Sequence, residues 1–308
     1  MLISTKGNLA VTLAQTDLVQ QALRKMDFIA VSDFVITDTA KWADLVLPAA
    51  SACEGWELVT YDSARNDYYY VEVPPGLLLN RPLPRCGDTR TDTEFIFSLA
   101  ERIGLNKEFW NGSIEASLND RLSPLNLSLQ DFSTKNTLIL PRAEFAGFQT
   151  PSGMVELFST IMEENGYSPV PVFCEPHESP ETRPDLLPSY PLILSSHKPR
   201  HFVHSSFRWV KGLREKEPEP LAEMHPETAA QHGITNGQEV VISSPRGSCY
   251  MKAKITQRVI PGVIFGVHGW SGRANINHLT ANDQCDPVLA CNSLKSTLCA
   301  LHPSHKEK

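Results

Sequence analysis

Prolines crowd between residues 160 and 191 and divide the chain into two kinds of sequence pattern. Seven of them lie among acidic and small polar residues: Pro169, Pro171, Pro176, Pro180, Pro184, Pro188 and Pro191. Proline fixes φ and lacks a backbone N–H, so such a run continues neither a helix nor an inner strand. A chain of 308 residues can bury two separate cores. We therefore predict two folded domains joined by a connecting segment over residues 136–190.

The pattern before this crossing alternates between helices and short buried strands. Apolar residues recur at helical spacing behind a cap at Thr16 or Asp17, and Gly104 closes a later helix. The predicted helices cover residues 16–26, 39–43 and 92–103, and the predicted strands cover 27–31 and 45–47. This alternation predicts an α/β domain over residues 1–135.

After the crossing, turns separate short strands at regular intervals. Asn236-Gly237 and Pro261-Gly262 are turn signals, and Gly233 ends a short helix over 226–232. The predicted strands cover residues 190–194, 239–243, 248–256 and 263–267. Short strands spaced in this way predict a small β-barrel domain over residues 191–308.

Charge and hydropathy exclude two classes of protein. The formal net charge is −7 and no basic stripe is present, which argues against nucleic-acid binding. No window approaches the roughly 18 to 20 apolar residues of a membrane helix, and the first residues do not form a basic and then apolar leader. We expect no membrane insertion and a cytoplasmic location, while an export signal on a preceding segment stays open as the alternative.

The cysteines give no sign of a metal centre. There are seven, an odd number, and no two of them form a C-x-x-C pair. Their spacing fits neither a disulfide framework nor the ligand runs of iron–sulfur clusters or structural zinc. We expect no metal ligand and no catalytic residue in this chain, since the common hydrolase, phosphate-loop and zinc-protease motifs are also missing from the sequence.

Three stretches resemble the molybdopterin oxidoreductase family, of the dimethyl sulfoxide reductase and formate dehydrogenase type, and they occur in the family's order. Residues 31–48, followed by Glu54, resemble the pattern S-D-x-x-x-T-E-T-A-x-x-A-D-x-V-L-P and then E. Residues 148–159 are similar to the passage T-P-S-G-K-I-E-L-x-S. Residues 195–287 resemble the family's C-terminal molybdopterin dinucleotide-binding domain. The sequence departs from the family's pattern at three places. Asp38 stands where Glu is usual, and Met154 stands where Lys is usual. Ala290-Cys291 stand where a small residue and Gly are usual, which weakens the assignment of the final loop.

The resemblance implies both a fold and a function. The fold is an α/β domain followed by a double-psi β-barrel. The function is cofactor binding in a Mo- or W-dependent oxidoreductase that uses bis(molybdopterin guanine dinucleotide). Members of the family place the metal ligand and an iron–sulfur motif before the point where this chain starts, so we expect the isolated chain to be inactive. Its expected partners are that N-terminal half or electron-transfer subunits. The alternatives are a stand-alone cofactor-binding or structural protein, and a non-redox member such as a hydratase.

Residue chemistry and the resemblance together select the candidate cofactor site. A pterin dinucleotide offers a pyrophosphate, riboses and a guanine edge, which require hydroxyl and amide donors, a cation and a carboxylate. The resemblance implies eleven binding residues: Ser32, Asp33, Thr37, Ser195, Ser196, His197, Arg200, His204, Ser205, Asn277 and Asp286.

Other roles for these residues stay open from the sequence alone. Asp33 and Thr37 follow a strand and could instead cap the next helical piece, and a histidine is often a satisfied surface or core group. The resemblance implies that the dinucleotide lies between the two domains, so we expect Ser32, Asp33 and Thr37 to face a cleft shared with residues 195–205 or 277–286. We also expect these polar groups to be accessible to solvent, because a buried unpaired polar group costs about 1 to 3 kcal/mol.

Overall fold

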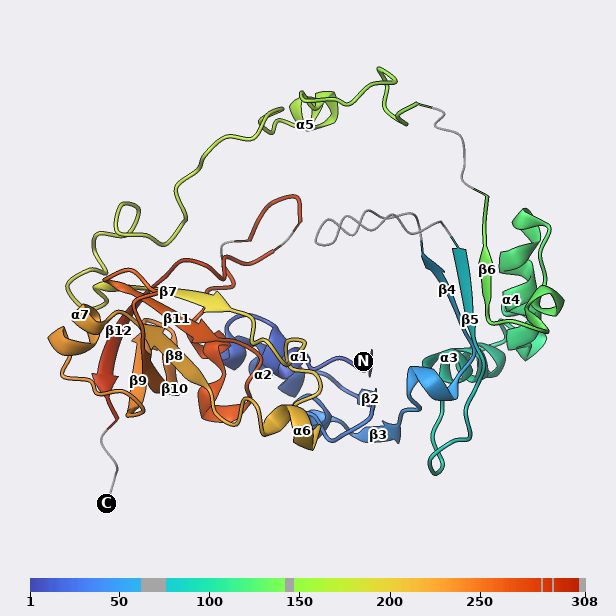
Figure 1. Ribbon diagram of the computed structural model, residues 1–308, viewed down its shortest axis with the longest axis horizontal. Helices are drawn as coiled ribbons and strands as arrows, with labels where there is room; N and C mark the ends of the chain where they lie inside the picture. Colours follow the sequence, from blue (N-terminus) through green and yellow to red (C-terminus); the bar gives the residue numbers. More distant parts are fainter. Residues whose placement is uncertain (62–75, 142–146, 284, 290, 305–308) are drawn as a thin grey trace.

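The computed structural model of the protein describes residues 1–61, 76–141, 147–283, 285–289 and 291–304. The described chain forms three separate sheets (Figure 1). Two sheets have three strands each and the third is a closed six-stranded barrel. The sequence predicted one α/β domain over residues 1–135, whereas the structure divides this stretch between the two smaller sheets.

The first sheet is parallel, with the strand order β1 (Leu2–Thr5), β2 (Ile29–Asp33) and β3 (Leu45–Pro48). All five residues of β2 are buried, and α1 (Leu9–Thr12) and α2 (Thr16–Arg24) contribute to the core beside it. Parallel strands buried in this way are continuously apolar until they end, and β2 ends in the polar pair Ser32-Asp33. The predicted strand over 27–31 therefore lies two residues further along.

Two local expectations in this unit were wrong. Helix α2 follows Gln15, which has a left-handed backbone with φ of 53°, so neither Thr16 nor Asp17 is its N-cap. The Thr16 hydroxyl instead accepts a hydrogen bond from the Asn275 side chain at 3.0 Å. Strand β3, predicted to be buried, is an edge strand on which Leu45 is 43% exposed.

The second sheet is antiparallel and has its own core. It contains β4 (Glu57–Tyr61), β5 (Gly76–Asn80) and β6 (Thr137–Ile139), with α3 (Asp92–Arg102) and α4 (Ile114–Leu122) beside it. Its buried side chains include Leu77, Leu79, Leu122 and Phe132. Helix α3, which the sequence predicted, begins with a capping box in which Thr91 and Glu94 bond each other's backbone N–H. A bridge between Ala49 and Arg90 connects this unit to the first sheet.

The barrel closes in the order β10, β8, β11, β7, β12, β9. Its strands are β7 (Leu192–His197), β8 (Leu221–Met224), β9 (Glu239–Ser244), β10 (Gly247–Ile255), β11 (Val263–Val267) and β12 (Thr297–Pro303). Two helices lie in its connections, α6 (Lys211–Arg214) and α7 (Pro226–Gln231). Inward residues such as Met224, Ile242 and Ile264 are fully buried and form the largest core of the molecule.

Short 3₁₀ helices occur in connections throughout the described chain. They cover Ala40–Trp42, Ala52–Glu54, Trp110–Gly112, Ser123–Leu125, Leu129–Phe132, Gly272–Ala274 and Ile276–His278.

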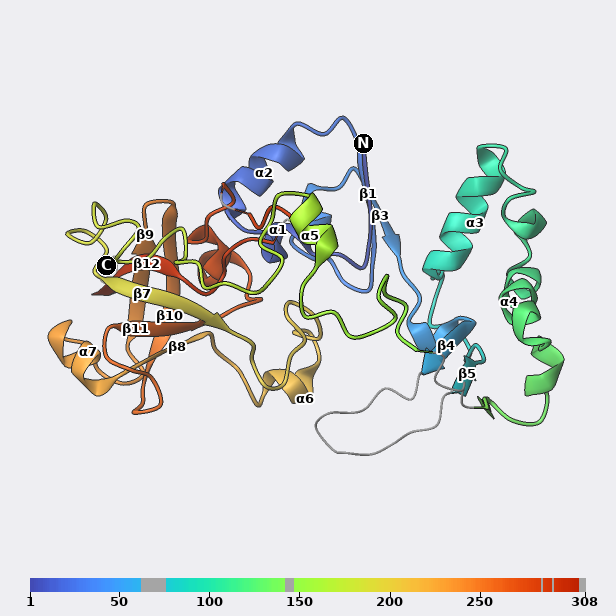
Figure 2. The same cartoon turned by 90° about the horizontal axis from the view of Figure 1, so that it is seen from above.

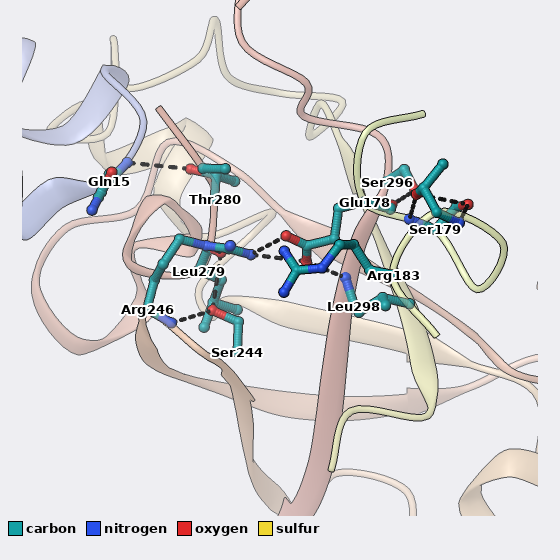
Figure 3. A network of polar contacts seen from close by, with 12 residues as sticks. Gln15, Glu178, Ser179, Arg183, Ser244, Arg246, Leu279, Thr280, Ser296 and Leu298 are labelled. Carbon is teal, nitrogen blue, oxygen red and sulfur yellow. Dashed lines mark hydrogen bonds and ion pairs between the residues drawn. The ribbon is translucent and has the colours of Figure 1, made fainter. Parts of the chain in front are cut away.

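The crossing between β6 and β7 arches over the molecule and carries the short helix α5 (Thr160–Glu164) (Figures 1 and 2). It reaches the barrel at Glu178, which is buried and paired with Arg246 at 2.8 Å (Figure 3). Within the described part of the chain, no helix is long and apolar enough to span a bilayer.

The first unit packs against the barrel through the segment after β11. Asn275 binds Thr16, and the Asn277 side chain donates to the carbonyl of Val11 at 2.8 Å. The backbone N–H of Gln15 donates to the Thr280 hydroxyl at 3.4 Å (Figure 3). These contacts place the polar end of β2 beside the loop that follows β7.

Candidate functional site

A small cleft, here called the Asp33 cleft, lies between the first unit and the loop after β7. It encloses about 90 Å³. Its lining residues are Lys6, Asn8, Asp33, Phe34, Thr37, Ser205, Ser206, Phe207 and Trp209. The structure therefore brings together Asp33, Thr37 and Ser205, three of the candidate residues, from two different domains.

The carboxyl group of Asp33 forms the acidic part of this cleft. Burial raises its pKa, although the backbone N–H groups of Phe34 and Val35 and the charge of Lys6 act in the opposite direction. The Phe34 N–H donates to Oδ1 at 2.7 Å. Lys6 stays close because it pairs with Asp92 at 3.0 Å and lies over the Phe34 ring. A partly desolvated carboxyl of this kind gains from a ligand N–H or O–H.

The hydroxyl groups of the cleft differ in how far they are already used. The Thr37 hydroxyl accepts the N–H of Ala40, the first residue of the next 3₁₀ turn, at 3.2 Å, whereas the N-cap position of that turn is Thr39. It still has a proton to donate. The hydroxyls of Ser205 and Ser206 have no hydrogen-bond partner among the described residues and are free to bind a ligand.

A second cavity, here called the histidine pocket, continues along the same loop and encloses about 220 Å³. It is lined by Val11, Thr12, Ser196, His204, His268, Gly269, Ile276, Asn277, Thr280 and Leu294. His204 belongs to this pocket and its neighbour Ser205 to the Asp33 cleft, so the two cavities adjoin.

Two histidines meet in the histidine pocket. His204 Nδ1 lies 2.9 Å from His268 Nε2. His204 has a left-handed backbone with φ of 53°, and its carbonyl group faces Gly269 so closely that a Cβ there would lie 2.3 Å from the oxygen. Position 269 therefore requires glycine.

Arg208 fixes this loop from behind. Its Nη2 donates to the carbonyl of His268 at 2.8 Å and to that of His204 at 3.1 Å. Its guanidinium lies 4.3 Å from the ring centroid of Phe202 and 4.5 Å from that of Trp270. Burial lowers the pKa of Arg208 to about 10. Arg208 therefore remains charged at neutral pH and holds the two histidine backbones together.

Ser196 and Asn277 also line the histidine pocket, and the other five candidate residues lie outside both cavities. Successive side chains of a strand point to opposite faces, so Ser196 lines the histidine pocket whereas His197 lines a separate groove of about 570 Å³ together with Arg200. Ser32 lines another cavity, beside β3 and α3. The Asp286 carboxylate binds the N–H groups of its own turn, at Val288 and Leu289. Ser195 lines none of these cavities, and Ala290 lies outside the described residues.

The expected solvent accessibility of these polar groups was wrong for four of them. Ser32, Asp33, Ser196 and Asn277 are all buried. Asn277 is buried at low cost because its amide binds the Val11 carbonyl and its oxygen accepts the Thr280 hydroxyl. Hydrogen bonds within the protein replace water at Asn277, so burial is compatible with this polar side chain.

Sequence reasoning missed Lys6, Asn8, His268 and Arg208. The only local signals are a Lys-Gly-Asn turn directly after β1 and a His-Gly-Trp sequence directly after β11, both at strand ends. Among the described residues, no group of three or more His, Cys, Asp or Glu side chains is arranged to hold a metal ion.

Two family models match this chain. The model described as molybdopterin oxidoreductase matches residues 1–102, and the one described as molydopterin dinucleotide binding domain matches residues 192–298. The chain belongs to the molybdopterin oxidoreductase family, as the resemblance implied.

Individual relatives are considerably longer than this chain. Acetylene hydratase of Syntrophotalea acetylenica is 28% identical over 81% of this chain and 34% of its own length. The catalytic subunit of assimilatory nitrate reductase of Bacillus subtilis is 27% identical over 96% of this chain and 40% of its own length. The chain thus spans about a third to two fifths of these relatives. The solved structure of acetylene hydratase from Pelobacter acetylenicus has the same fold over 98% of this chain and 44% of that one, with a TM-score of 0.83 and 24% identity.

Proposed function

We propose that this chain is the part of a Mo- or W-dependent oxidoreductase that binds molybdopterin guanine dinucleotide. The observation that carries the proposal is the Asp33 cleft, where Asp33 and Thr37 from the first matched region meet Ser205 from the second. We also propose that the barrel is of the double-psi type. Its two parallel pairs, β7 with β11 and β8 with β10, within one closed barrel support this topology.

The residues present fit the chemistry of a pterin dinucleotide. Asp33 is a carboxyl acceptor for a guanine or ribose donor, and Thr37, Ser205 and Ser206 have hydroxyl protons to donate. Lys6 supplies positive charge for a phosphate. The two adjoining cavities are each smaller than the roughly 300–1,000 Å³ of a typical small-molecule site. We therefore treat them as subsites of one larger site.

Each subsite has a separate task in this proposal. When bound, the metal–dithiolene centre supplies the redox chemistry, and the protein supplies binding, orientation and electrostatics. The Asp33 cleft holds the dinucleotide end through hydrogen bonds to a carboxyl and to serine hydroxyls. The histidine pocket holds the heterocyclic end between the apolar side chains of Val11, Ile276 and Leu294.

We propose further that turnover requires the additional length that the relatives possess. The metal ligand and any iron–sulfur cluster belong to that part, which makes it or an electron-transfer subunit the expected partner. The isolated chain should therefore lack viologen-linked turnover even when supplied with molybdate. Stoichiometric metal together with turnover in the isolated chain would contradict this, and cofactor binding without turnover in any assembly would favour the stand-alone binding protein.

The binding proposal is tested by measuring affinity for the dinucleotide. We expect Asp33→Asn to weaken binding about tenfold, since a hydrogen bond to a charged group contributes about 1.5 to 3 kcal/mol and 1.4 kcal/mol corresponds to a factor of ten. Asp38→Asn is the matched control, because Asp38 pairs with Lys41 at 2.8 Å and lines neither cavity. Equal affinity of the Asp33 and Asp38 variants would refute the site.

A further inference from the structure

The crossing between β6 and β7 contains an acidic and apolar segment, residues 150–175, here called the acidic arch. Nine large apolar side chains between Met154 and Phe173 are exposed, and those of Leu157 and Phe173 are 85% and 86% exposed. The arch contains four glutamates and neither lysine nor arginine. Exposed apolar side chains gathered in this way are typical of a surface that binds another polypeptide.

The acidic arch makes no polar contact with the rest of the described chain. Each of its hydrogen bonds joins two of its own residues, such as the Ser159 N–H and the Pro169 carbonyl at 2.8 Å. Glu163, Glu164 and Glu175 are exposed and form no ion pair among the described residues. The arch lies apart from the three sheets (Figure 1). Its apolar side chains and these carboxylates therefore lack a partner within one copy of the described chain.

The barrel has a groove of opposite charge, here called the basic groove. It encloses about 570 Å³ over β7, β8, β10 and β11, and its apolar lining includes Leu221, Val267 and Trp270. Four cations of the groove have no carboxylate partner within the described part of the chain: Lys198, Arg200, Lys216 and Arg258. They lie together on a chain whose formal net charge is −7. The basic groove therefore favours an acidic ligand that also has apolar groups.

The three carboxylates of the basic groove are already bound within the chain. Glu219 and Glu223 pair with lysines, Glu223 at 2.8 Å. Glu217 joins two walls of the groove, because its Oε1 accepts the Arg200 backbone N–H at 3.0 Å and lies 3.0 Å from His201 Nδ1. The groove thus has walls that are fixed relative to each other and keeps an excess of unpaired positive charge.

We propose that the acidic arch of one copy of this chain binds in the basic groove of a second copy, and that the reciprocal contact closes a dimer. The arch supplies carboxylates for the unpaired cations, and its apolar side chains cover the apolar lining of the groove. Because each copy carries both surfaces, the exchange is complete with two copies. Opposite charges give such a contact its specificity, and the apolar surface removed from water stabilises it. The inference goes beyond the proposed function, since Asp33 belongs to neither surface.

Sedimentation equilibrium of the full chain measures the association. We expect a monomer–dimer equilibrium whose dissociation constant rises at least about tenfold between about 0.05 and 0.5 M NaCl, because salt screens exposed charges. A monomer at every protein concentration, or an association that salt does not weaken, would overturn the inference.

Charge reversal tests which two surfaces meet. The groove variant is Lys216→Glu with Arg258→Glu, and the arch variant is Glu163→Lys with Glu164→Lys. Each variant alone should dimerise at least about tenfold more weakly than the wild type, since both of its contacts lose opposite charges. An equal mixture of the two should form a heterodimer that is tighter than either homodimer, because it retains one wild-type arch in one wild-type groove.

The control is Lys107→Glu with Lys135→Glu. Both lysines are exposed and belong to neither surface, and this pair changes the net charge as much as the groove variant does. Its dissociation constant should stay within about threefold of the wild type. The inference fails if the groove or arch variant dimerises like the wild type, if the control weakens the dimer as much as they do, or if the mixture associates no better than its components.

Discussion

Replacing Glu178 should destabilise the barrel more than any other single change in the crossing. The side chains of Glu178 and Arg246 are only 11% and 17% exposed and lie 2.8 Å apart (Figure 3). Glu178 also accepts the backbone N–H of Leu298 at 2.6 Å, and Arg246 donates to the Leu279 carbonyl at 2.7 Å. Glu178→Leu removes one partner of a buried ion pair and leaves the Nη2 group of Arg246 and the backbone N–H of Leu298 without the acceptor they share.

The expected loss in the free energy of unfolding is about 3–5 kcal/mol, the range for breaking a buried pair from one side. The double variant Glu178→Leu with Arg246→Met should recover most of this loss, because an apolar pair of similar volume needs no desolvated charge to be satisfied. Exchange of the Leu298 amide hydrogen should accelerate in the single variant, since its acceptor is gone.

Urea denaturation of the variants measures these differences. Asp185→Leu is the control, because Asp185 forms an exposed pair with Arg183 in the same crossing and should change stability little. The reasoning is refuted if Glu178→Leu unfolds at the same urea concentration as the Asp185 variant. It is also refuted if the double variant is as unstable as the single variant at Glu178.

Three further predictions concern the barrel. The free energy of unfolding should fall by about 1–3 kcal/mol as the pH drops from about 6.5 towards 4, because His268 binds a proton in the unfolded chain but not in the folded chain, where its pKa is about 4. His268→Gln should flatten this part of the profile of urea stability against pH. Gly269→Ala should lower the melting temperature and abolish pterin binding, since the new Cβ collides with the His204 carbonyl, and a variant with wild-type melting and binding would disprove the close approach. Burial raises the pKa of Cys249 to about 12 and also raises the pKa of Cys299. Neither thiol should therefore react with iodoacetamide at pH 8 in the folded chain, and mass spectrometry of labelled peptides measures this.

Short-range patterns in the sequence predicted the elements that depend on neighbouring residues. Helix α3 carries its own capping box and stop, and the barrel strands β9, β10 and β11 are bounded by glycine turns, so each appears within a residue or two of its expected place. The sequence did not predict the division of residues 1–135, because β6 completes the second sheet from beyond that range. A strand of three residues that pairs with β5 over a long separation has no local signature.

The candidate site shows the same limit. A cleft shared by Asp33, Thr37 and residues 195–205 could be predicted only because the family resemblance implies that the dinucleotide lies between the α/β domain and the barrel. Ser32, predicted to face the same cleft, lines a different cavity. The partner of His204 could not be predicted, since His268 follows a different strand and meets it only through the parallel pairing of β7 with β11.

Hydrogen exchange with and without the dinucleotide tests the central claim most directly. The measurement compares the isolated chain alone with the chain saturated with molybdopterin guanine dinucleotide. The account predicts added protection in two separate segments, residues 31–37 after β2 and residues 204–209 after β7, which line one cleft. Protection confined to other segments, or none at all, would contradict the proposed binding site.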